Sequence, residues 1–393
     1  MNNLRLLFTS LLLLCISALA PQVSAQVAPD LQGQIWQGTM DGDPGQGSLL
    51  YRLEFTSATD VTITKQYGGD NVVEQHQWQL QGDQLVIHAA ADAKIDDFTD
   101  ASMVFSSDTR FRYDKGDKHF TGHKWIQWRA YAHVLFVLLG LMAMNEICRH
   151  YKWPTVVIFF VLPIALIPLW ASYEVSYWFK WVKLYSVVGA CVLFTLIRYT
   201  KVGEFKWAKF AAAAFLGINI AEAVMQDFSM GYTANVLNAI GGIFSIVTMT
   251  GWAYIHARED KVRDMVWPAM TSFWIIAYDV WNFAFVYLNF PGSATAQFMV
   301  LTAATIPSLL IAKGTWLQAR AFTLALSFMY YFSNPAFYES NVVMLPRNDE
   351  LMLALGLLSF VLNGILFVQV FGAKWRDYQN NKNNPNNQTP IAH

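Results

Sequence analysis

The stretch from Thr271 to Phe290 (TSFWIIAYDVWNFAFVYLNF) constrains the fold of this chain more than any other part of the sequence. It is long enough to cross a bilayer, which takes roughly 20 mostly apolar residues of helix. It nevertheless carries Asp279 and Asn282 in its middle, spaced so that both lie on one face of a helix. An acid at that depth is costly unless it faces a protein interior or a wet cavity. The stretch therefore predicts a membrane-spanning helix whose polar face looks into the protein.

The composition supports a membrane protein. The 393 residues are 54% hydrophobic and only 14% charged, with a mean hydropathy of +0.28, whereas a soluble chain carries about 25% charged residues. The net charge is −1 and no basic block is present, which makes a nucleic-acid partner unlikely on physical grounds and leaves membrane lipids and a small solute as the expected partners. No zinc spacing, phosphate loop or nucleophile elbow occurs, so we expect no metal, no cofactor and no catalytic residue.

The first 25 residues have the pattern of a secretory signal peptide. Arg5 supplies the positive start, Leu6 to Ala20 form the apolar core, and Val23-Ser24-Ala25 is a small-residue cleavage site. The alternative is an uncleaved anchor helix. Either interpretation predicts that the segment after Ala25 is exported.

Residues 26–118 are expected to form a small exported antiparallel β domain. Runs such as SLLYRLEF (48–55) and DVTITKQY (60–67) alternate apolar and polar residues between turn residues. With IWQG (35–38) and WQLQGDQLVI (78–87), the segment resembles the small lipocalin-like β domains of exported bacterial proteins, which implies a ligand-binding barrel. A packed β sandwich that binds no small molecule is the alternative.

Residues 119–129 are expected to be a juxtamembrane linker, because Lys, His and Trp mix there as they do in the headgroup layer. His119 and His123 have no third ligand nearby and do not predict a metal site. Nine apolar segments follow and predict an α-helical polytopic membrane domain over residues 130–372: 130–149, 153–171, 179–198, 206–226, 233–256, 265–289, 294–312, 315–335 and 350–372. Residues 373–393 are polar and Asn-rich, which predicts a disordered tail.

Lys and Arg alternate between the loops of this domain. Every second loop is basic and the intervening loops are poor in Lys and Arg. The basic residues are Arg149, Lys152, Arg198, Lys201, Lys206, Lys209, Arg258, Lys261, Arg263, Lys313, Arg320, Lys374 and Arg376. The positive-inside rule then predicts an inner-membrane protein with the β domain outside and the C-terminus in the cytoplasm.

Polar residues of three successive segments are expected to meet in the outer half of the membrane. They are Asn219 and Glu222 in the fourth segment, Asn235 and Asn238 in the fifth, and Asp279 and Asn282 in the sixth. These residues predict one carboxylate- and amide-lined pocket for a small solute or ion, open toward the β domain. The asparagines have an alternative role, since amides in membrane helices often only join one helix to another.

A second polar set is expected nearer the cytoplasm. Glu146 and Arg149 share one helical turn of the first segment, and Arg320 begins a polar stripe in the eighth. Pairing of Glu146 with Arg149 or with Arg320 is the simplest account, in a structural or gating role.

Several motifs resemble an uncharacterised bacterial family of multi-pass inner-membrane proteins, a domain of unknown function. They are WFKWVKLYS (178–186), NIAEAVMQDF (219–228), GWAYI (251–255), WPAMTSFWIIAYDVWNFAFVYL (267–288) and KGTWLQARAFTLAL (313–326). The resemblance covers residues 130–375 and implies a membrane location. It brings no activity and no site residues. The β domain is a departure from the simpler members of that family.

Three functions remain open on the sequence alone. The first is binding or transport of a small cationic or polar solute through the outward-facing pocket. The second is an intramembrane enzyme acting on a lipid or an envelope precursor, with Asp279 and Glu222 as acid and base. The third is a non-catalytic envelope sensor or assembly protein whose β domain is the reader. The sequence leaves the oligomeric state undetermined.

Overall fold

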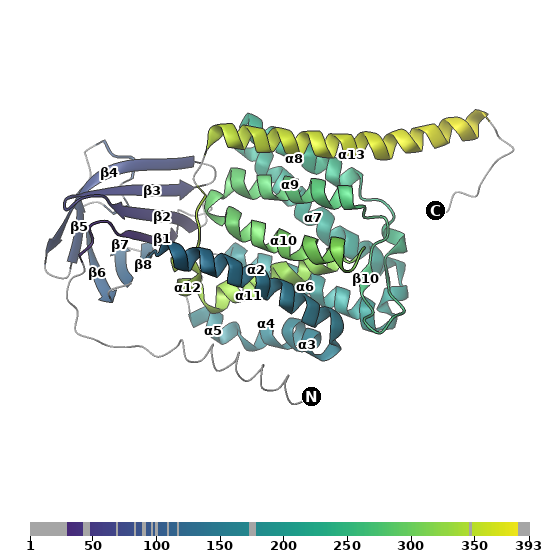
Figure 1. Ribbon diagram of the computed structural model, residues 1–393, viewed down its shortest axis with the longest axis horizontal. Helices are drawn as coiled ribbons and strands as arrows, with labels where there is room; N and C mark the ends of the chain where they lie inside the picture. The colour runs from purple at the N-terminus through teal and green to yellow at the C-terminus, as the bar shows by residue number, and fades with distance from the viewer. Residues whose placement is uncertain are drawn as a thin grey trace.

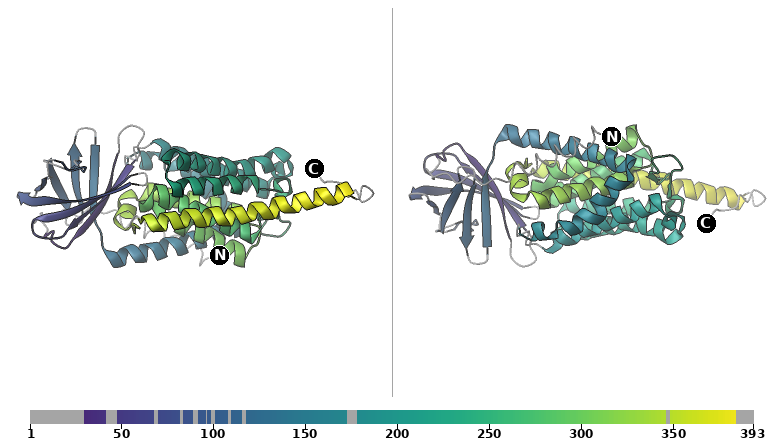
Figure 2. Two further views of the ribbon diagram at one scale, coloured as in Figure 1. Left: turned by 90° about the horizontal axis from the view of Figure 1, so that it is seen from above. Right: turned by 90° about the horizontal axis from the view of Figure 1, so that it is seen from below.

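The computed structural model describes residues 30–41, 48–67, 70–81, 84–88, 92–95, 97–98, 101–107, 110–115, 118–172, 178–345 and 348–383. Within these ranges, an antiparallel β-barrel lies at one end of a set of helices that run roughly along the long axis of the molecule (Figure 1 and Figure 2). The predicted signal peptide and the residues after Asn383 lie outside the described ranges.

The barrel is closed and has eight strands, each paired with its neighbours in the chain, and β1 pairs with β8. This arrangement confirms the antiparallel β domain. The strands are β1 (Ile35–Asp41), β2 (Ser48–Phe55), β3 (Asp60–Tyr67), β4 (Asp70–Gln81), β5 (Gln84–His88), β6 (Ala101–Ser107), β7 (Arg110–Lys115) and β8 (Lys118–Lys124).

The predicted linker over 119–129 is wrong for most of its length. Its first part is strand β8, and helix α2 begins at Gln127, so only Trp125 and Ile126 separate them. The pattern was hidden because one of the two inward positions of β8 is Gly122, where a Cβ would collide with the ring of Phe111. Phe120 alone supplies an apolar signal there, and its side chain is fully buried.

Side chains fill the barrel interior. Its core is rich in aromatic rings, among them Trp36, Tyr51, Phe98 and Phe120, and the rings of Phe98 and Phe120 lie 5.0 Å apart in an edge-to-face contact. Phe98 comes from the segment between β5 and β6. Asp97 beside it accepts hydrogen bonds from Tyr51 Oη at 2.8 Å and Lys65 Nζ at 2.6 Å, which fixes that segment against the barrel wall.

The rest of the described chain is mainly helical. Its helices are α2 (Gln127–His150), α3 (Lys152–Val156), η1 (Val157–Val161), α4 (Leu162–Ala165), α5 (Ile167–Ser172), α6 (Trp178–Tyr199), η2 (Lys201–Glu204), α7 (Lys206–Met230), α8 (Thr233–Val247), η3 (Trp252–Tyr254), α9 (Ser272–Asn289), η4 (Pro291–Ser293), α10 (Ala294–Leu310), α11 (Trp316–Ser333), α12 (Pro335–Ser340) and α13 (Asp349–Asn383). Four stretches are long and apolar enough to cross a membrane, and they suggest a membrane protein: Gln127–His150, Lys180–Tyr199, Lys206–Met230 and Asp349–Arg376.

Two of the predicted segments are shorter as helices than expected. The segment 233–256 is helical only to Val247, and 265–289 becomes helical only at Ser272. Gly251 adopts a left-handed φ of 69°, and a two-stranded hairpin of β9 (His256–Ala257) and β10 (Met265–Val266) follows. Apolar composition in GWAYI and MVWPAM therefore marks a partly buried connection, with the short 3-10 helix Trp252–Tyr254 and strand β10 in it, and not a continuous α-helix.

The predicted disorder from residue 373 is wrong as far as Asn383. Helix α13 continues to that residue, 35 residues in all, and its last turns project beyond the other helices (Figure 1). Lys374 and Arg376, which suggested the end of a membrane segment, lie within the helix because Lys and Arg are good helix formers.

Successive long helices run in alternating directions, so the helical part has a barrel end and an opposite far end (Figure 1). The basic connections predicted from the sequence, such as those around Lys201, Arg258 and Lys313, gather at the far end, where β9 packs on α6 and η2. Large exposed apolar side chains also divide unevenly: in the described residues Val73 and Val104 are those of the barrel, and the others, such as Phe136 and Ile218, lie on the helical part. Such a surface is typical of a protein whose helices face lipid.

The short helix α12 holds the barrel against the helical part by packing on β1 and β8. The carbonyl oxygen of Val342 accepts hydrogen bonds from Gln37 Nε2 at 3.2 Å and from Trp125 Nε1 at 3.0 Å. Thr39 Oγ1 donates to Glu339 Oε1 at 3.0 Å. His123 on β8 is buried beside this contact, and burial together with the charge of Arg110 lowers its pKa to about 4.

Candidate functional site

The residues predicted to form one outer pocket separate into distinct groups in the structure. Asn235 and Asn238 join an acid that was not predicted, Glu222 pairs with a lysine, and Asp279 and Asn282 face two other helices. The expectation of one pocket is therefore replaced by three local arrangements. Buried polar atoms without partners occur in two of them: Asn235 Oδ1 and Asn238 Oδ1 beside the acid that was not predicted, and Asp279 Oδ1 with Arg320 Nε and Nη1.

Asp227 lies at the centre of what we call the amide cluster, with Asn235, Asn238 and Asn289. All four side chains are fully buried. Asp227 Oδ1 accepts hydrogen bonds from the Nδ2 atoms of Asn235 at 2.9 Å and Asn289 at 2.7 Å, and Oδ2 accepts one from Asn238 Nδ2 at 2.7 Å. Three amide donors compensate the loss of hydration of the carboxylate. The cluster joins α7, α8 and α9 near the barrel end, which supports the helix-joining role of the two predicted asparagines.

Glu222 lies on α7 outside this cluster. Its Oε2 accepts a hydrogen bond from Lys183 Nζ of α6 at 2.5 Å, and both side chains are partly exposed. Asn219, one turn earlier on α7, is half-buried and belongs to none of the groups described here. These two residues therefore do not meet Asp279 or the predicted asparagines of α8.

Five side chains from three helices form a closed arrangement that we call the central ring: Asp279 and Asn282 of α9, Thr305 of α10, and Trp316 and Arg320 of α11. Thr305 Oγ1 donates to Asp279 Oδ2 at 2.5 Å and accepts from Trp316 Nε1 at 2.9 Å. Arg320 Nη2 donates to Asn282 Oδ1 at 3.3 Å. One helical turn of α9 and one of α11 close the ring, because Asp279 and Asn282 are three residues apart and Trp316 and Arg320 four.

The central ring contains polar atoms without partners. Asp279 Oδ1 and the Nε and Nη1 atoms of Arg320 are buried and make no hydrogen bond to the described protein. Native proteins pair nearly all buried polar atoms with protein groups, water or a ligand. One acceptor atom and two donor atoms of the ring therefore have no hydrogen-bond partner among the described residues.

The central ring has an aromatic wall and reaches the protein surface. Trp274, Tyr278 and Trp316 pack together beside it, with the rings of Tyr278 and Trp316 4.9 Å apart. Asp279 and Thr305 are half-buried, whereas the Asn282 and Arg320 side chains beneath them are 5% and 6% exposed. Asp279 is thus more exposed than Arg320, although its free Oδ1 atom is buried. Local folding supports this placement, because Thr271 caps α9 by accepting from Trp274 N at 3.1 Å.

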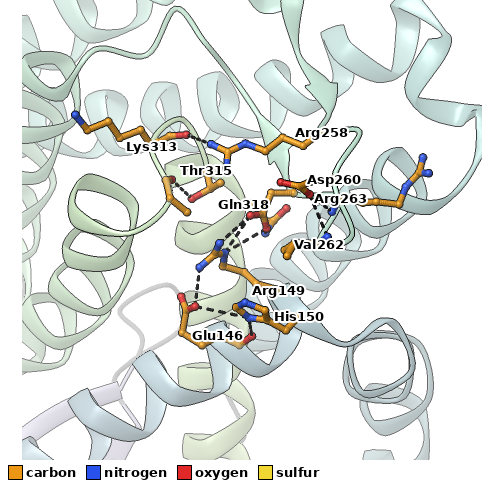
Figure 3. A network of polar contacts seen from close by, with 12 residues as sticks. Glu146, Arg149, His150, Arg258, Asp260, Val262, Arg263, Lys313, Thr315 and Gln318 are labelled. Carbon is orange, nitrogen blue, oxygen red and sulfur yellow. Dashed lines mark hydrogen bonds and ion pairs between the residues drawn. The ribbon is translucent and has the colours of Figure 1, made fainter.

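A third polar group, the far-end network, lies at the end away from the barrel (Figure 3). Arg149 donates from Nη1 to Glu146 Oε2 at 2.6 Å and from Nη2 to Asp264 Oδ2 at 2.9 Å. Gln318 Nε2 donates to Asp264 Oδ1 at 3.0 Å, and Gln318 Oε1 accepts from Met265 N at 2.8 Å. Each charge has a partner, so this network joins α2, α11 and the β9–β10 connection.

The predicted pairing of Glu146 with Arg149 is confirmed, and the alternative pairing of Glu146 with Arg320 is wrong. Arg320 donates to Asn282 in the central ring, and the arginine that Glu146 contacts is Arg149. Glu146 and Arg149 thus belong to the far-end network and Arg320 to the central ring.

Sequence reasoning missed Asp227, Asn289, Asp264 and Thr305. Asp227 lies just beyond the predicted segment 206–226 and was assigned to a loop, and Asn289 is the last residue of the predicted segment 265–289; both are polar residues in the last turn of a helix. Asp264 was not identified because it lies in a connection that is rich in Lys and Arg. In the part of the chain that the structure describes, no group of three or more His, Cys, Asp or Glu could hold a metal ion.

Comparison with known proteins gives one result. No curated protein matches the chain, and no solved structure does. The sequence profile of a family described as "Family of unknown function (DUF5692)" matches residues 124–389, which takes in the whole described helical part and leaves the barrel outside the match. This protein therefore belongs to the DUF5692 family of unknown function.

Proposed function

We propose that this protein is a multi-pass protein of the inner membrane that binds a small polar solute in the central ring and transports it. The observation that carries the proposal is that three polar atoms of the ring, Asp279 Oδ1 and Arg320 Nε and Nη1, are buried and make no hydrogen bond to the described protein. Groups of this kind, buried in an apolar environment, are costly unless a ligand or water completes their hydrogen bonds.

The proposed topology has nine crossings, an exported barrel and a cytoplasmic far end. Four long apolar helices and the exposed apolar side chains of the helical part support a membrane location. The basic connections at the far end support its cytoplasmic placement, because Lys and Arg favour that side. A reporter that is active only in the cytoplasm, fused after Asn383, should be active; activity only of a reporter that requires export would overturn this orientation.

Passage through the ring is supported by its position between helices that can adjust. Pro307 lies within α10 two residues after Thr305 and cannot donate a backbone hydrogen bond there. Helix α10 is nevertheless continuous from Ala294 to Leu310, so the missing hydrogen bond is a local weak point in it. Binding of a solute would then be sensed directly by α9, α10 and α11.

The test is a thermal-shift screen of the purified full chain in detergent against cations, amines, amino acids, sugars and lipids. A ligand that binds the native state raises its stability by mass action. We expect at least one small polar compound to raise the unfolding midpoint of the wild type and to have little effect on Asp279→Asn. If no compound distinguishes the two proteins, the central ring is not a solute site.

A second candidate function, an envelope sensor, is favoured by a chain of contacts from the barrel into the helices. Glu339 Oε1 accepts from Thr39 Oγ1 of β1 and from Tyr331 Oη of α11, each at 3.0 Å, and Tyr331 Oη also accepts from Lys180 Nζ of α6 at 3.0 Å. Helix α11 also carries Arg320. A variant with Thr39→Val and Gln37→Leu should loosen the barrel, and a sensor role requires that this changes solute affinity at the ring. Unchanged affinity would remove the sensor role.

A further inference from the structure

We propose that the solute of the central ring is a zwitterion whose amine contacts Asp279 and whose acid group contacts Arg320. This inference rests on the proposed function and narrows it, since the sequence alone pointed to a cationic or polar solute.

The first argument is charge balance. The ring contains one carboxylate, Asp279, and one guanidinium, Arg320, and its other members are neutral. The other acids expected nearby have partners elsewhere: Glu222 pairs with Lys183 at 2.5 Å, and Asp227 accepts from three amides. A simple cation in the ring would face the unused donors of Arg320, which repel it. A simple anion would meet the same problem at Asp279.

The second argument is that the two charges do not satisfy each other. Arg320 donates to Asn282 and not to Asp279, and Asp279 receives its hydrogen bond from Thr305. A direct ion pair would give all the unused atoms partners and would remove the cost of leaving them buried. Asn282 and Thr305 instead supply the hydrogen bonds that the two charged groups do not give each other.

The third argument is geometric complementarity. A planar guanidinium can donate two parallel hydrogen bonds to a carboxylate, which suits the acid end of a zwitterion. An ammonium has three donors and no acceptor, so it suits the free Oδ1 of Asp279. Because Asp279 is more exposed than Arg320, the amine of the bound solute would lie nearer the surface than its acid group.

The experiment uses small probes that differ only in charge. Glycine, β-alanine and 4-aminobutyrate are zwitterions of increasing charge separation. Butylamine, butyrate and 1,4-butanediol keep the four-carbon length of the last one and remove one charge or both. Dissociation constants for the purified full chain in detergent are measured from the concentration dependence of the unfolding midpoint.

We expect at least one of the zwitterions to bind the wild type and to bind it more tightly than the three other probes. Asp279→Asn and Arg320→Gln should each weaken that zwitterion by about 30-fold or more, because each leaves one charge of the solute unpaired. The two variants should also differ: Asp279→Asn should lose residual butylamine binding, and Arg320→Gln should lose residual butyrate binding. A merely structural role would lower the affinity for all probes alike.

Two controls keep the result interpretable. Glu222→Gln removes an acid of the same helical part that lies outside the ring and should leave the affinity unchanged. Arg320→Lys keeps the charge and removes the planar guanidinium, so it should weaken the zwitterion while the protein still folds.

The remaining outcomes each decide the question. If butanediol, or an uncharged compound of the wider screen, binds as tightly as the zwitterions and loses affinity in Asp279→Asn, the proposed solute site stands and the zwitterion inference is overturned. If butylamine alone binds tightly, the solute is a cation and the inference is again overturned. If neither these probes nor the wider screen distinguish the wild type from Asp279→Asn, the solute site itself is wrong and water fills the ring.

Discussion

The barrel and the helical part bury their carboxylates in different ways. In the barrel, Asp97 accepts hydrogen bonds from Tyr51 and Lys65, and aromatic rings fill the space around it. In the helical part, Asp227 and Asp264 are equally well paired, but Asp279 has a single hydrogen bond and one unused oxygen. The difference is informative because the hydrogen bonds of Asp97, Asp227 and Asp264 account for their burial within the fold. Asp279 has one buried oxygen without a partner among the described residues, which is the basis of our proposal.

The comparison also separates residues that hold the fold together from residues of the proposed solute site. The barrel interior is a packed core, and its contacts with α12 fix its place on the helices. The far-end network and the amide cluster likewise hold helices together. We therefore expect substitutions in those regions to act on stability and substitutions in the central ring to act on ligand binding.

The largest loss of stability is expected for Asp264→Ala. This change leaves Arg149 buried without its main partner, and breaking a buried ion pair costs about 3–5 kcal/mol. The free energy of unfolding, measured with denaturant in detergent, should fall by that amount. Asp264→Asn should cost less because the amide oxygen can still accept. An effect of Asp264→Ala below about 1 kcal/mol would contradict a structural role for this network.

A comparable loss confined to the barrel is expected for Phe98→Ala. The ring of Phe98 is fully buried among Tyr51, Tyr113 and Phe120, and its removal should cost about 3–4 kcal/mol. Near-ultraviolet circular dichroism and proteolysis should show a less stable barrel, whereas solute affinity of the helical part should be retained. A matched surface change, Arg112→Ala, should have almost no effect. Loss of solute binding in Phe98→Ala would show that the two parts are not independent.

Acidification is expected to weaken the barrel through His123. Its pKa falls from an ordinary value near 6.5 to about 4 in the folded protein, so the unfolded chain binds a proton more readily between these values. Stability from this group is complete above about pH 6.5 and is lost as the pH falls toward 4, by about 3 kcal/mol at most. Melting curves between pH 7 and pH 4.5 should show the loss. His123→Gln should remove this part of the pH dependence, and an identical slope in the variant would exclude His123 as its source.

The smallest effect on stability is expected for Asp279→Asn. The carboxylate makes one hydrogen bond, to Thr305, and an amide oxygen can accept it in the same place. The unfolding free energy should change by no more than about 1 kcal/mol. A loss as large as that of Asp264→Ala would place Asp279 among the structural acids and would remove the contrast between them.

Hydrophobic periodicity and apolar segments predicted the two-part architecture. Alternation identified the β domain, the apolar segments identified the helices, and the resemblance to an uncharacterised family is confirmed over residues 124–389. The errors have local causes. Strand β8 was missed because Gly122 interrupts its alternation of apolar and polar residues. The connection after Thr248 was predicted as helix because it is apolar. These positions are decided by contacts between distant segments, which a single sequence does not contain.

The candidate site was predicted only in part. Helical spacing placed Asp279 and Asn282 on one face, and that face does look into the protein. Glu222 and Asn235 have the same residue types and comparable depth, yet they face Lys183 and Asp227. Which acids share a pocket depends on how the helices pack, and α11 with Arg320 lies beside α9 although a whole helix separates them in the chain. In our proposal, the guanidinium narrows the expected solute from a cationic or polar compound to a zwitterion.

An experimental structure of the full chain in lipid nanodiscs, with 4-aminobutyrate added and without it, tests the central claim most directly. The account predicts that Asp279 and Arg320 remain separated in both maps and that density in contact with Asp279 Oδ1 and Arg320 Nε or Nη1 appears or strengthens with a zwitterion. A direct ion pair between Asp279 and Arg320 in both maps, with no room between them, would contradict it.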